Sequence, residues 1–134
     1  MPEQNLEKLL AEMTPYLHSQ AFVFCTMSEE QFRKLALIPQ GIFREEEGLT
    51  LFLTKDEAER LQIPYQNLWA LITLKIHSDL LSCGFMAAVA QKLAAANIAL
   101  NPVAGYFHDH LFVPYEKAEE TLNLLGELSQ SVRN

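Results

Sequence analysis

Two histidines flank an aspartate in the stretch "VAGYFHDHLFVP", Val103–Pro114, and these residue types could bind a metal or transfer protons. In a β-strand, alternate residues share a face, so we expect His108 and His110 to point together while Asp109 points away. Zinc sites usually assemble about three or four ligands, yet the chain has only two other histidines and no HxxxH, HExxH or CxxC motif. We therefore expect no metal, and we interpret His108 and His110 as partly buried strand residues that can still contact a ligand or an interface.

The densest cluster of charge is "FREEEG", Phe43–Gly48, where Arg44 and Glu46 share one face of a predicted strand. One interpretation is a solvated hairpin tip whose charges discourage pairing at a sheet edge. The other is a binding role, in which Arg44 clamps a carboxylate and Glu46 accepts an ammonium group. Together the two side chains would hold a zwitterion.

The segment "HSDLLSCGF", His77–Phe85, connects the end of a predicted strand to the start of a predicted helix. Free backbone N–H groups at such a helix start attract a carboxylate, and the helix dipole adds to the attraction. Gly84 would let a ligand approach the backbone closely. The same segment equally predicts a simple helix cap from Ser78 or Ser82, so both interpretations stay open.

The composition is that of a globular protein that does not bind nucleic acid. Its 134 residues carry a formal net charge of −7, and lysine and arginine are scattered through two acidic halves, so a phosphate backbone would be repelled. The start of the chain lacks the pattern of a signal peptide, and no apolar run approaches the roughly 18 residues of a membrane span. We expect a cytoplasmic protein without membrane contact, in which Cys25 and Cys83 are reduced thiols.

The pattern of apolar residues predicts the order strand–helix–strand–strand–helix twice, in Ala21–Leu61 and in Asn67–Gln130. This order is typical of an α+β, ferredoxin-like fold, with antiparallel sheets and helices packed on one face. The expected organisation is an N-terminal helix (1–17), a first unit (18–66) and a second unit (67–134). No linker separates the units, so we expect them to pack closely as one domain pair.

Local signals support particular elements of this prediction. Ser28 with Gln31 and Thr54 with Glu57 have the spacing of capping boxes, each of which starts a helix. Trp69 is expected in the core. The main predicted elements are a first helix at Asn5–Tyr16, strands at Ala21–Met27 and Leu68–Ser78, and helices at Lys55–Leu61, Gly84–Ala96 and Tyr115–Gln130.

Three segments together resemble a largely uncharacterised bacterial family of short ACT-domain proteins. They are "FREEEGLTLFL" (Phe43–Leu53), "ITLKIHSDLLSCGFMAAVAQKLAAANI" (Ile72–Ile98) and "NPVAGYFHDHLFVPYEKAEETLNLL" (Asn101–Leu125). The family is related in fold to the ACT modules of amino-acid sensors such as the CASTOR proteins. The resemblance implies tandem ACT-like βαββα units with a regulatory, non-catalytic role. A full unit also has a fourth strand after its second helix, and none is predicted after Gln130, so we expect the strand at 69–77 to serve twice or strands to be exchanged between the units.

The resemblance also implies where a ligand would bind, because ACT modules hold an amino acid where the strand–helix turn of one unit faces another unit. The corresponding turns are Thr26–Ser28 and Ser78–Phe85, with Asn101 beside the second. Combined with the residues above, the candidate ligand-binding set is Thr26, Ser28, Arg44, Glu46, His77, Ser78, Asp79, Gly84, Phe85, Asn101, His108 and His110.

Three functions follow from these patterns. The first is a regulatory module without cofactor or catalysis that binds an amino acid at an ACT–ACT interface, as a homodimer or with a partner protein. The second is a ligand-free assembly module in which the sheet face of Leu71 and Thr73, rimmed by Lys75 and His77, packs on another copy. The third is a metal-dependent enzyme using His108 and His110. No nucleotide-binding or hydrolase motif occurs in the chain.

Overall fold

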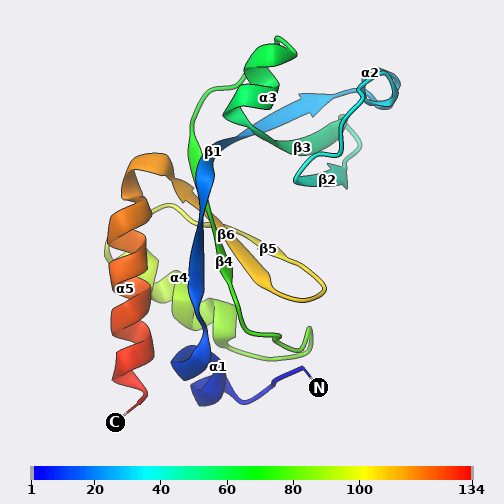
Figure 1. The fold of residues 1–134 in the computed structure, drawn as a ribbon. Coiled ribbons are helices and arrows are strands. Elements are labelled where there is room, and N and C mark those ends of the chain that lie inside the picture. Colours follow the sequence, from blue (N-terminus) through cyan, green and yellow to red (C-terminus); the bar gives the residue numbers. More distant parts are fainter. Residues whose placement is uncertain (1, 134) are drawn as a thin grey trace. The chain divides into compact units, whose positions relative to one another are not determined.

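The computed structural model describes residues 2–133 and divides the chain into two compact units. Unit 1 comprises Met1–Ser19 and Ala70–Asn134, and unit 2 comprises Gln20–Trp69. In chain order the elements are α1 (Leu6–Glu12), β1 (Pro15–Met27), α2 (Glu29–Arg33), β2 (Gly41–Arg44), β3 (Leu49–Thr54), α3 (Lys55–Arg60), β4 (Trp69–Leu74), α4 (Phe85–Ala95), β5 (Asn101–Ala104), β6 (Asp109–Pro114), the short 3-10 helix η1 (Tyr115–Lys117) and α5 (Ala118–Ser131) (Figure 1).

The expected order strand–helix–strand–strand–helix occurs twice, as β1-α2-β2-β3-α3 and as β4-α4-β5-β6-α5. The pairs β1–β3, β2–β3 and β5–β6 are antiparallel, so the predicted α+β, ferredoxin-like fold is confirmed. Strand order is β2-β3-β1 in unit 2 and β1-β4-β6-β5 in unit 1. The first part of β1, residues 15–19, therefore lies beside β4 and takes the place of the fourth strand, so it is β1 that takes part in both units, and not the strand at 69–77 that was expected to serve twice.

The N-terminal helix is shorter than predicted. Helical periodicity indicated Asn5–Tyr16, but α1 ends at Glu12 and an extended strand begins at Pro15. Proline disfavours helical geometry in the residue before it and cannot continue the hydrogen-bond ladder. The prediction was therefore wrong over the last turn, and β1 starts six residues before the expected Ala21.

The sequence analysis treated the first helix as a segment of its own, and in the structure it packs on α4 and α5 of unit 1. Two side chains from the last residues of the chain donate hydrogen bonds to carbonyl groups at the C-terminal end of α1. The Ser129 hydroxyl donates to the Leu10 carbonyl at 2.7 Å, and the Arg133 guanidinium donates to the Ala11 carbonyl at 2.7 Å. The last carbonyls of a helix lack intrahelical partners, so these contacts tie α1 to α5.

Each unit has its own apolar core on the helix-covered side of its strands. In β3 every second residue is buried, as expected for a strand with one face against helices. In unit 1, α4 and α5 lie on the same side of the strands (Figure 1). The core of unit 2 consists of Val23, Cys25, Leu49, Leu51, Leu53 and Ala58. The core of unit 1 consists of Leu9, Leu10, Met13, Ala70, Ile72, Leu74, Phe85, Val89, Leu93, Ile98, Leu111, Val113, Ala118 and Leu125.

Both capping boxes are present as predicted, at Ser28 with Gln31 and at Thr54 with Glu57. The predicted strand Leu68–Ser78 is shorter, because the N–H of Ile76 donates to the Leu74 carbonyl and turns the chain there. Trp69, expected in the core, is only half-buried at the start of β4. Among residues 2–133, no helix has the length and apolar character needed to cross a membrane.

Candidate functional site

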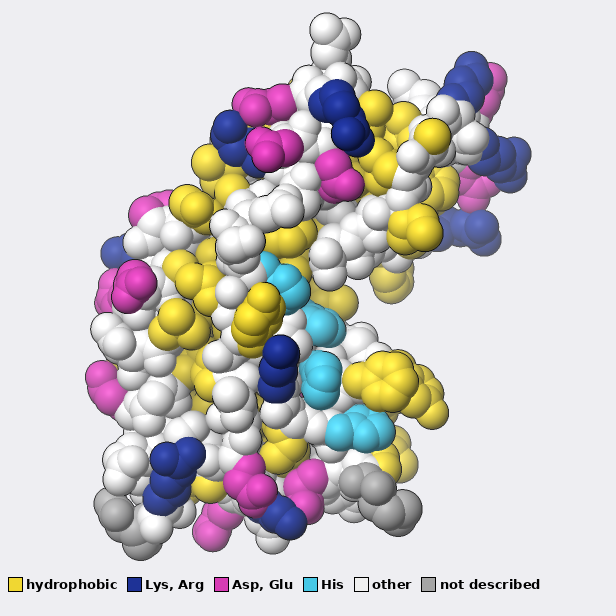
Figure 2. Space-filling view, in the orientation of Figure 1, with side chains coloured by type: hydrophobic (Ala, Val, Ile, Leu, Met, Phe, Trp, Pro, Cys, Tyr) yellow, Lys and Arg dark blue, Asp and Glu magenta, His cyan; other side chains and the backbone are white. Residues whose placement is uncertain are grey.

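The four histidines of the chain all belong to unit 1, and Figure 2 shows histidine side chains gathered in a stripe on one face. Two of them flank Thr73 on the sheet face opposite the helices. Thr73 Oγ1 lies 2.9 Å from His18 Nε2 and 2.9 Å from His110 Nδ1. The three residues come from the neighbouring strands β1, β4 and β6. Because the hydroxyl has one proton, it donates to one imidazole and accepts an N–H from the other when both rings are neutral.

The surroundings of this chain of hydrogen bonds favour neutral imidazoles. Burial lowers the pKa of His18, and the positive charge of Lys75 lowers it further. Burial also lowers the pKa of His110, with further lowering by His108 and His18 and an opposing effect of Asp109. Both groups are therefore uncharged at neutral pH. The Tyr16 ring lies edge-on to the His18 ring, with centroids 5.0 Å apart. Lys75 Nζ lies over the Tyr16 ring, 4.1 Å from its centroid.

The stretch that first suggested catalysis, Val103–Pro114, covers the end of β5, the tip of the β5–β6 hairpin and all of β6. His108 comes just before β6 and its Nδ1 lies 3.3 Å from the Ile76 carbonyl, a contact in which the ring nitrogen donates. Asp109 accepts a hydrogen bond of 3.2 Å from the buried Ser78 hydroxyl. Three successive residues therefore have three different partners, and His110 faces Thr73 instead of sharing a ligand with His108. Among residues 2–133, no three His, Cys, Asp or Glu side chains are grouped so that they could hold a metal ion, so the metal-dependent hypothesis gains no support.

The turn between β4 and α4 contains several of the candidate residues, and the N-terminal segment covers it. The main chain of Glu3 pairs with it like a strand, because the Glu3 N–H donates to the His77 carbonyl and the Asp79 N–H donates to the Glu3 carbonyl, each at 2.8 Å. Gln4 adds a side-chain hydrogen bond of 2.9 Å to the Asp79 carboxylate. The pKa of Asp79 is lowered by the N–H of Leu81 and by this Gln4 contact.

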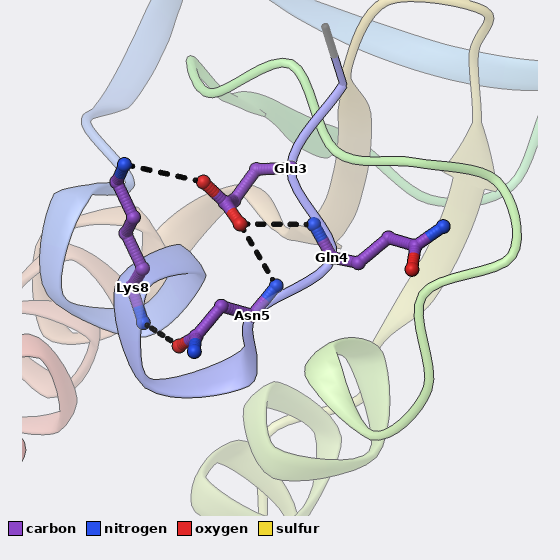
Figure 3. Close-up of polar contacts among 4 residues, drawn as sticks. All are labelled: Glu3, Gln4, Asn5 and Lys8. Carbon is purple, nitrogen blue, oxygen red and sulfur yellow. Dashed lines mark hydrogen bonds and ion pairs between the residues drawn. The ribbon is translucent and has the colours of Figure 1, made fainter.

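Figure 3 shows how the covering segment is itself ordered. The Glu3 carboxylate accepts hydrogen bonds from the N–H groups of Gln4, at 3.1 Å, and Asn5, at 2.9 Å, and it pairs with Lys8 Nζ at 3.3 Å. Asn5 caps α1 by accepting the Lys8 N–H at 2.9 Å. These contacts lower the pKa of Glu3, with the Asn5 N–H as the largest cause. The conformation of Glu3 is therefore held from both sides, by its own side chain and by the turn.

At the other end of the turn, α4 starts without a side-chain cap. Gly84 is the N-cap residue and adopts a left-handed φ of 94°, which glycine tolerates best. The first turn of α4 has no acidic residue, and Phe85 is buried in the core of unit 1. A Cβ at position 84 would lie 3.3 Å from a methyl group of Leu6. The helix start predicted as a carboxylate site is therefore uncapped, with the N-terminal segment alongside.

The candidates in unit 2 have separate partners. The Ser28 hydroxyl caps α2 by accepting the N–H of Gln31 at 3.1 Å. Arg44 Nε pairs with Glu29 Oε1 at 2.9 Å and is largely exposed. Glu46 is an exposed residue of the β2–β3 turn. Thr26 lines a cavity of about 360 Å³ near Trp69. Arg44 thus meets a glutamate of α2, a residue next to Ser28, and not the hairpin glutamate that the sequence suggested as its companion.

Asn101 does not lie beside the second turn. It pairs with Phe112 in the β5–β6 ladder, while Asp109, the partner of Ser78, pairs with Ala104. The two pairs are three positions apart along β5, a separation of about 10 Å at the usual rise per residue. The structure brings His77, Ser78, Asp79 and His108 to one end of the hairpin and leaves Asn101 at the other.

Sequence patterns missed Thr73, His18 and Glu3, which make the contacts that organise this region. Alternation along β4 placed Thr73 on the face opposite the core, but the identity of its neighbours depends on strand order. Leu71 and Thr73 are already buried, at 1% and 5% exposure. The ligand-free assembly hypothesis required Leu71 and Thr73 to be available for packing against a second copy. Both side chains are already covered within the chain.

Comparison with known proteins shows matches to two sequence models described as ACT domain, one over residues 1–70 and one over residues 69–127. No curated protein matches the chain. Among solved structures, a protein of unknown function from Vibrio cholerae, described as a possible transport protein, is 44% identical, with a TM-score of 0.82 over 93% of this chain and 96% of that one.

Two more distant structures share the fold. A protein from Agrobacterium tumefaciens is 17% identical, with a TM-score of 0.68 over 87% of this chain and 89% of that one. The regulatory subunit of aspartate kinase from Thermus thermophilus, in a ligand-free form, is 13% identical, with a TM-score of 0.69 over 89% of this chain and 97% of that one. At these identities the likeness is one of fold.

Proposed function

The chain belongs to the ACT-domain family, and on this premise we propose that it is a regulatory, non-catalytic module that binds an α-amino acid at the His77–Phe85 turn of unit 1. The observation that carries the proposal is the pairing of Glu3 with this turn. The turn offers a carbonyl acceptor at His77 and an N–H donor at Asp79, and one residue's own N–H and C=O satisfy both at 2.8 Å.

A free amino acid has the same N–Cα–C–O atoms as the main chain of Glu3. Its ammonium group can donate to the His77 carbonyl, and its carboxylate can accept from the Asp79 N–H with the added strength of an ionised partner. The uncapped start of α4 favours negative charge in the same turn. Glu3 therefore acts as an internal stand-in for the ligand, and an amino acid binds by displacing it.

The fold relatives are consistent with a regulatory role. One of them is described as the regulatory subunit of aspartate kinase, in a ligand-free form. We extend to this chain only the general role of a ligand-responsive module. A change in the position of the N-terminal segment on binding would alter the surface near the turn, which is how ligand binding would be passed to a partner protein.

We also propose that a second ACT unit, from another copy of the chain, closes over this turn. The rim of the turn is apolar and exposed, with Leu80, Leu81, Tyr106 and Phe107 between 62% and 85% exposed. The Phe107 ring lies beside His77, with centroids 5.6 Å apart. Exposed apolar patches of this kind are typical of protein interfaces. Sedimentation with and without the bound amino acid tests this part, and a monomer under both conditions would contradict it.

Calorimetry with the twenty standard amino acids tests the binding itself. The Glu3→Pro variant removes the N–H that donates to His77, so it should bind the same amino acid several-fold more tightly than the unmodified chain. Glu12→Ala, an exposed change at the far end of α1, should leave the affinity unchanged. Absence of heat and of any thermal shift with all twenty, for both the unmodified chain and Glu3→Pro, would refute the proposal.

A further inference from the structure

Unit 2 contains a cavity of about 360 Å³ that the proposed amino-acid site does not use. Its volume falls within the range of about 300 to 1,000 Å³ that is usual for small-molecule sites. It lies where β1 and the start of β4 meet the segment that follows α3. The lining residues are Phe24, Cys25, Thr26, Pro64, Tyr65, Gln66, Asn67 and Trp69.

The aromatic walls of this cavity are held in place by further contacts. Phe24 lies against Trp69, with ring centroids 5.3 Å apart and planes at 39°, and against Phe52, with centroids 4.8 Å apart. The Tyr65 hydroxyl donates to Glu59 at 3.1 Å, and Glu59 in turn accepts from Lys55 at 3.1 Å. The rings therefore form a fixed surface on which another ring could stack in an offset or edge-on arrangement.

None of the residues that line the cavity is charged at neutral pH. Burial raises the pKa of the Cys25 thiol. Burial and the neighbouring Glu59 raise the pKa of the Tyr65 hydroxyl. The remaining polar groups are a hydroxyl and two carboxamides, on Thr26, Gln66 and Asn67, which offer both donors and acceptors. In a chain with 27 charged side chains, a neutral lining offers an ionic ligand no partner of opposite charge, and it therefore favours an uncharged ligand.

We propose that this cavity binds a small, uncharged, planar heteroaromatic ring that carries donors and acceptors on its edge, as a nucleobase does. The ring stacks on the Phe24–Trp69 surface, and its edge forms hydrogen bonds with Thr26, Gln66 and Asn67. Stacking of a base on aromatic side chains tolerates different bases, while the amide groups select rings with polar edges. This site is independent of the amino-acid site in unit 1, so either can be shown or refuted alone.

Trp69 is the single tryptophan of the chain, so its fluorescence reports directly on this cavity. With the full-length chain and adenine as the probe, we expect saturable quenching of Trp69. The double change Gln66→Ala with Asn67→Ala should weaken binding about tenfold or more, which is the loss expected for about 1.4 kcal/mol of hydrogen bonding. Gln130→Ala, an exposed change on α5 in unit 1, should have no effect.

Two further probes test whether the ligand must be flat and whether it must be uncharged. Cyclohexanecarboxamide keeps an amide but has no flat ring, and tetramethylammonium is a cation that aromatic rings can bind. Neither should quench Trp69 at the concentrations at which adenine does. The proposal is overturned if adenine gives no saturable response, if either control probe matches it, or if the double alanine variant binds adenine as well as the unmodified chain.

Discussion

On the sheet face opposite its helices, unit 1 carries His18, Thr73 and His110 in one hydrogen-bonded row, whereas unit 2 carries Phe24 and Phe52 packed together, with Trp69 beside Phe24. The helix-covered faces of the two units are alike, since Leu, Val and Ala make up most of both cores.

The difference follows from the two-residue period of strands. Residues that face the helices are needed for the core and are apolar in both units, while the alternate residues can vary without changing the strand order. One unit uses this freedom for titratable groups and the other for uncharged rings. The same arrangement of strands and helices therefore supports a face with two histidines in unit 1 and a face with uncharged aromatic rings in unit 2.

The strongest test of the comparison removes one core leucine from each unit. Leu51→Ala in unit 2 and Leu125→Ala in unit 1 replace fully buried side chains, and each should lower the free energy of unfolding by about 2 to 5 kcal/mol. Because the two cores are separate clusters, hydrogen exchange should accelerate mainly in the unit that carries the change. Equal acceleration in both units would show that the chain unfolds as one body.

A matched pair of threonine changes compares the two faces directly. Thr73→Val should lower the free energy of unfolding by about 1 to 3 kcal/mol, because His18 and His110 both lose their shared hydroxyl in a partly buried setting. Thr50→Val removes a hydroxyl that donates to the exposed Glu45 carboxylate and should cost less than about 1 kcal/mol. Urea unfolding at neutral pH measures both, and equal losses would contradict the special role of Thr73.

Acidification should lower the stability of unit 1 more than that of unit 2. The pKa values of His18 and His110 are lowered in the folded chain, so the stability they contribute is present above the ordinary value of 6.5 and is lost as the pH falls from there through the lowered values. The free energy of unfolding should fall by at most about 1.4 kcal/mol per pH unit for each proton that unfolding takes up.

Unit 2 has no histidine and should not respond in this range. Urea titrations followed by NMR signals of each unit, at about pH 7 and about pH 5.5, distinguish the two. If Thr73→Val and the unmodified chain lose stability equally as the pH falls, the hydrogen-bonded row does not cause the effect.

The smallest expected effect concerns Lys75, whose ammonium group lies over the Tyr16 ring. Lys75→Gln should cost about 0.5 to 1 kcal/mol of stability. It should also raise the pKa of His18, because the positive charge that lowers it is gone. An NMR titration of His18 measures the change, with Lys92→Gln on α4, which pairs with Glu127, as the control that leaves His18 unaltered.

Local signals allowed much of the fold to be predicted from the sequence. The capping boxes at Ser28 and Thr54 depend on residues three positions apart, and the helix predicted at Gly84–Ala96 corresponds closely to α4 at Phe85–Ala95. Alternation along β4 separated Ala70, Ile72 and Leu74, which lie in the core of unit 1, from Leu71 and Thr73 on the other face. These features need no knowledge of distant residues.

The contacts that organise the candidate site could not be predicted in the same way. Thr73 meets His18 and His110 only because β4 lies between β1 and β6, an order that no local pattern encodes. Glu3 meets His77 and Asp79 across more than seventy residues. The turn itself was predicted as a strand–helix connection, but its covering segment was not, and the ligand-binding roles of its residues stay predictions.

The division of the chain also has a consequence for its synthesis. Unit 2 is a continuous stretch, Gln20–Trp69, inserted between the two parts of unit 1. During translation the N-terminal part usually folds first, but here Leu9, Leu10 and Met13 find most of their core partners in residues made after unit 2. The nascent chain must therefore carry α1 with its apolar face uncovered until α4 and α5 leave the ribosome, while the inserted unit can already fold.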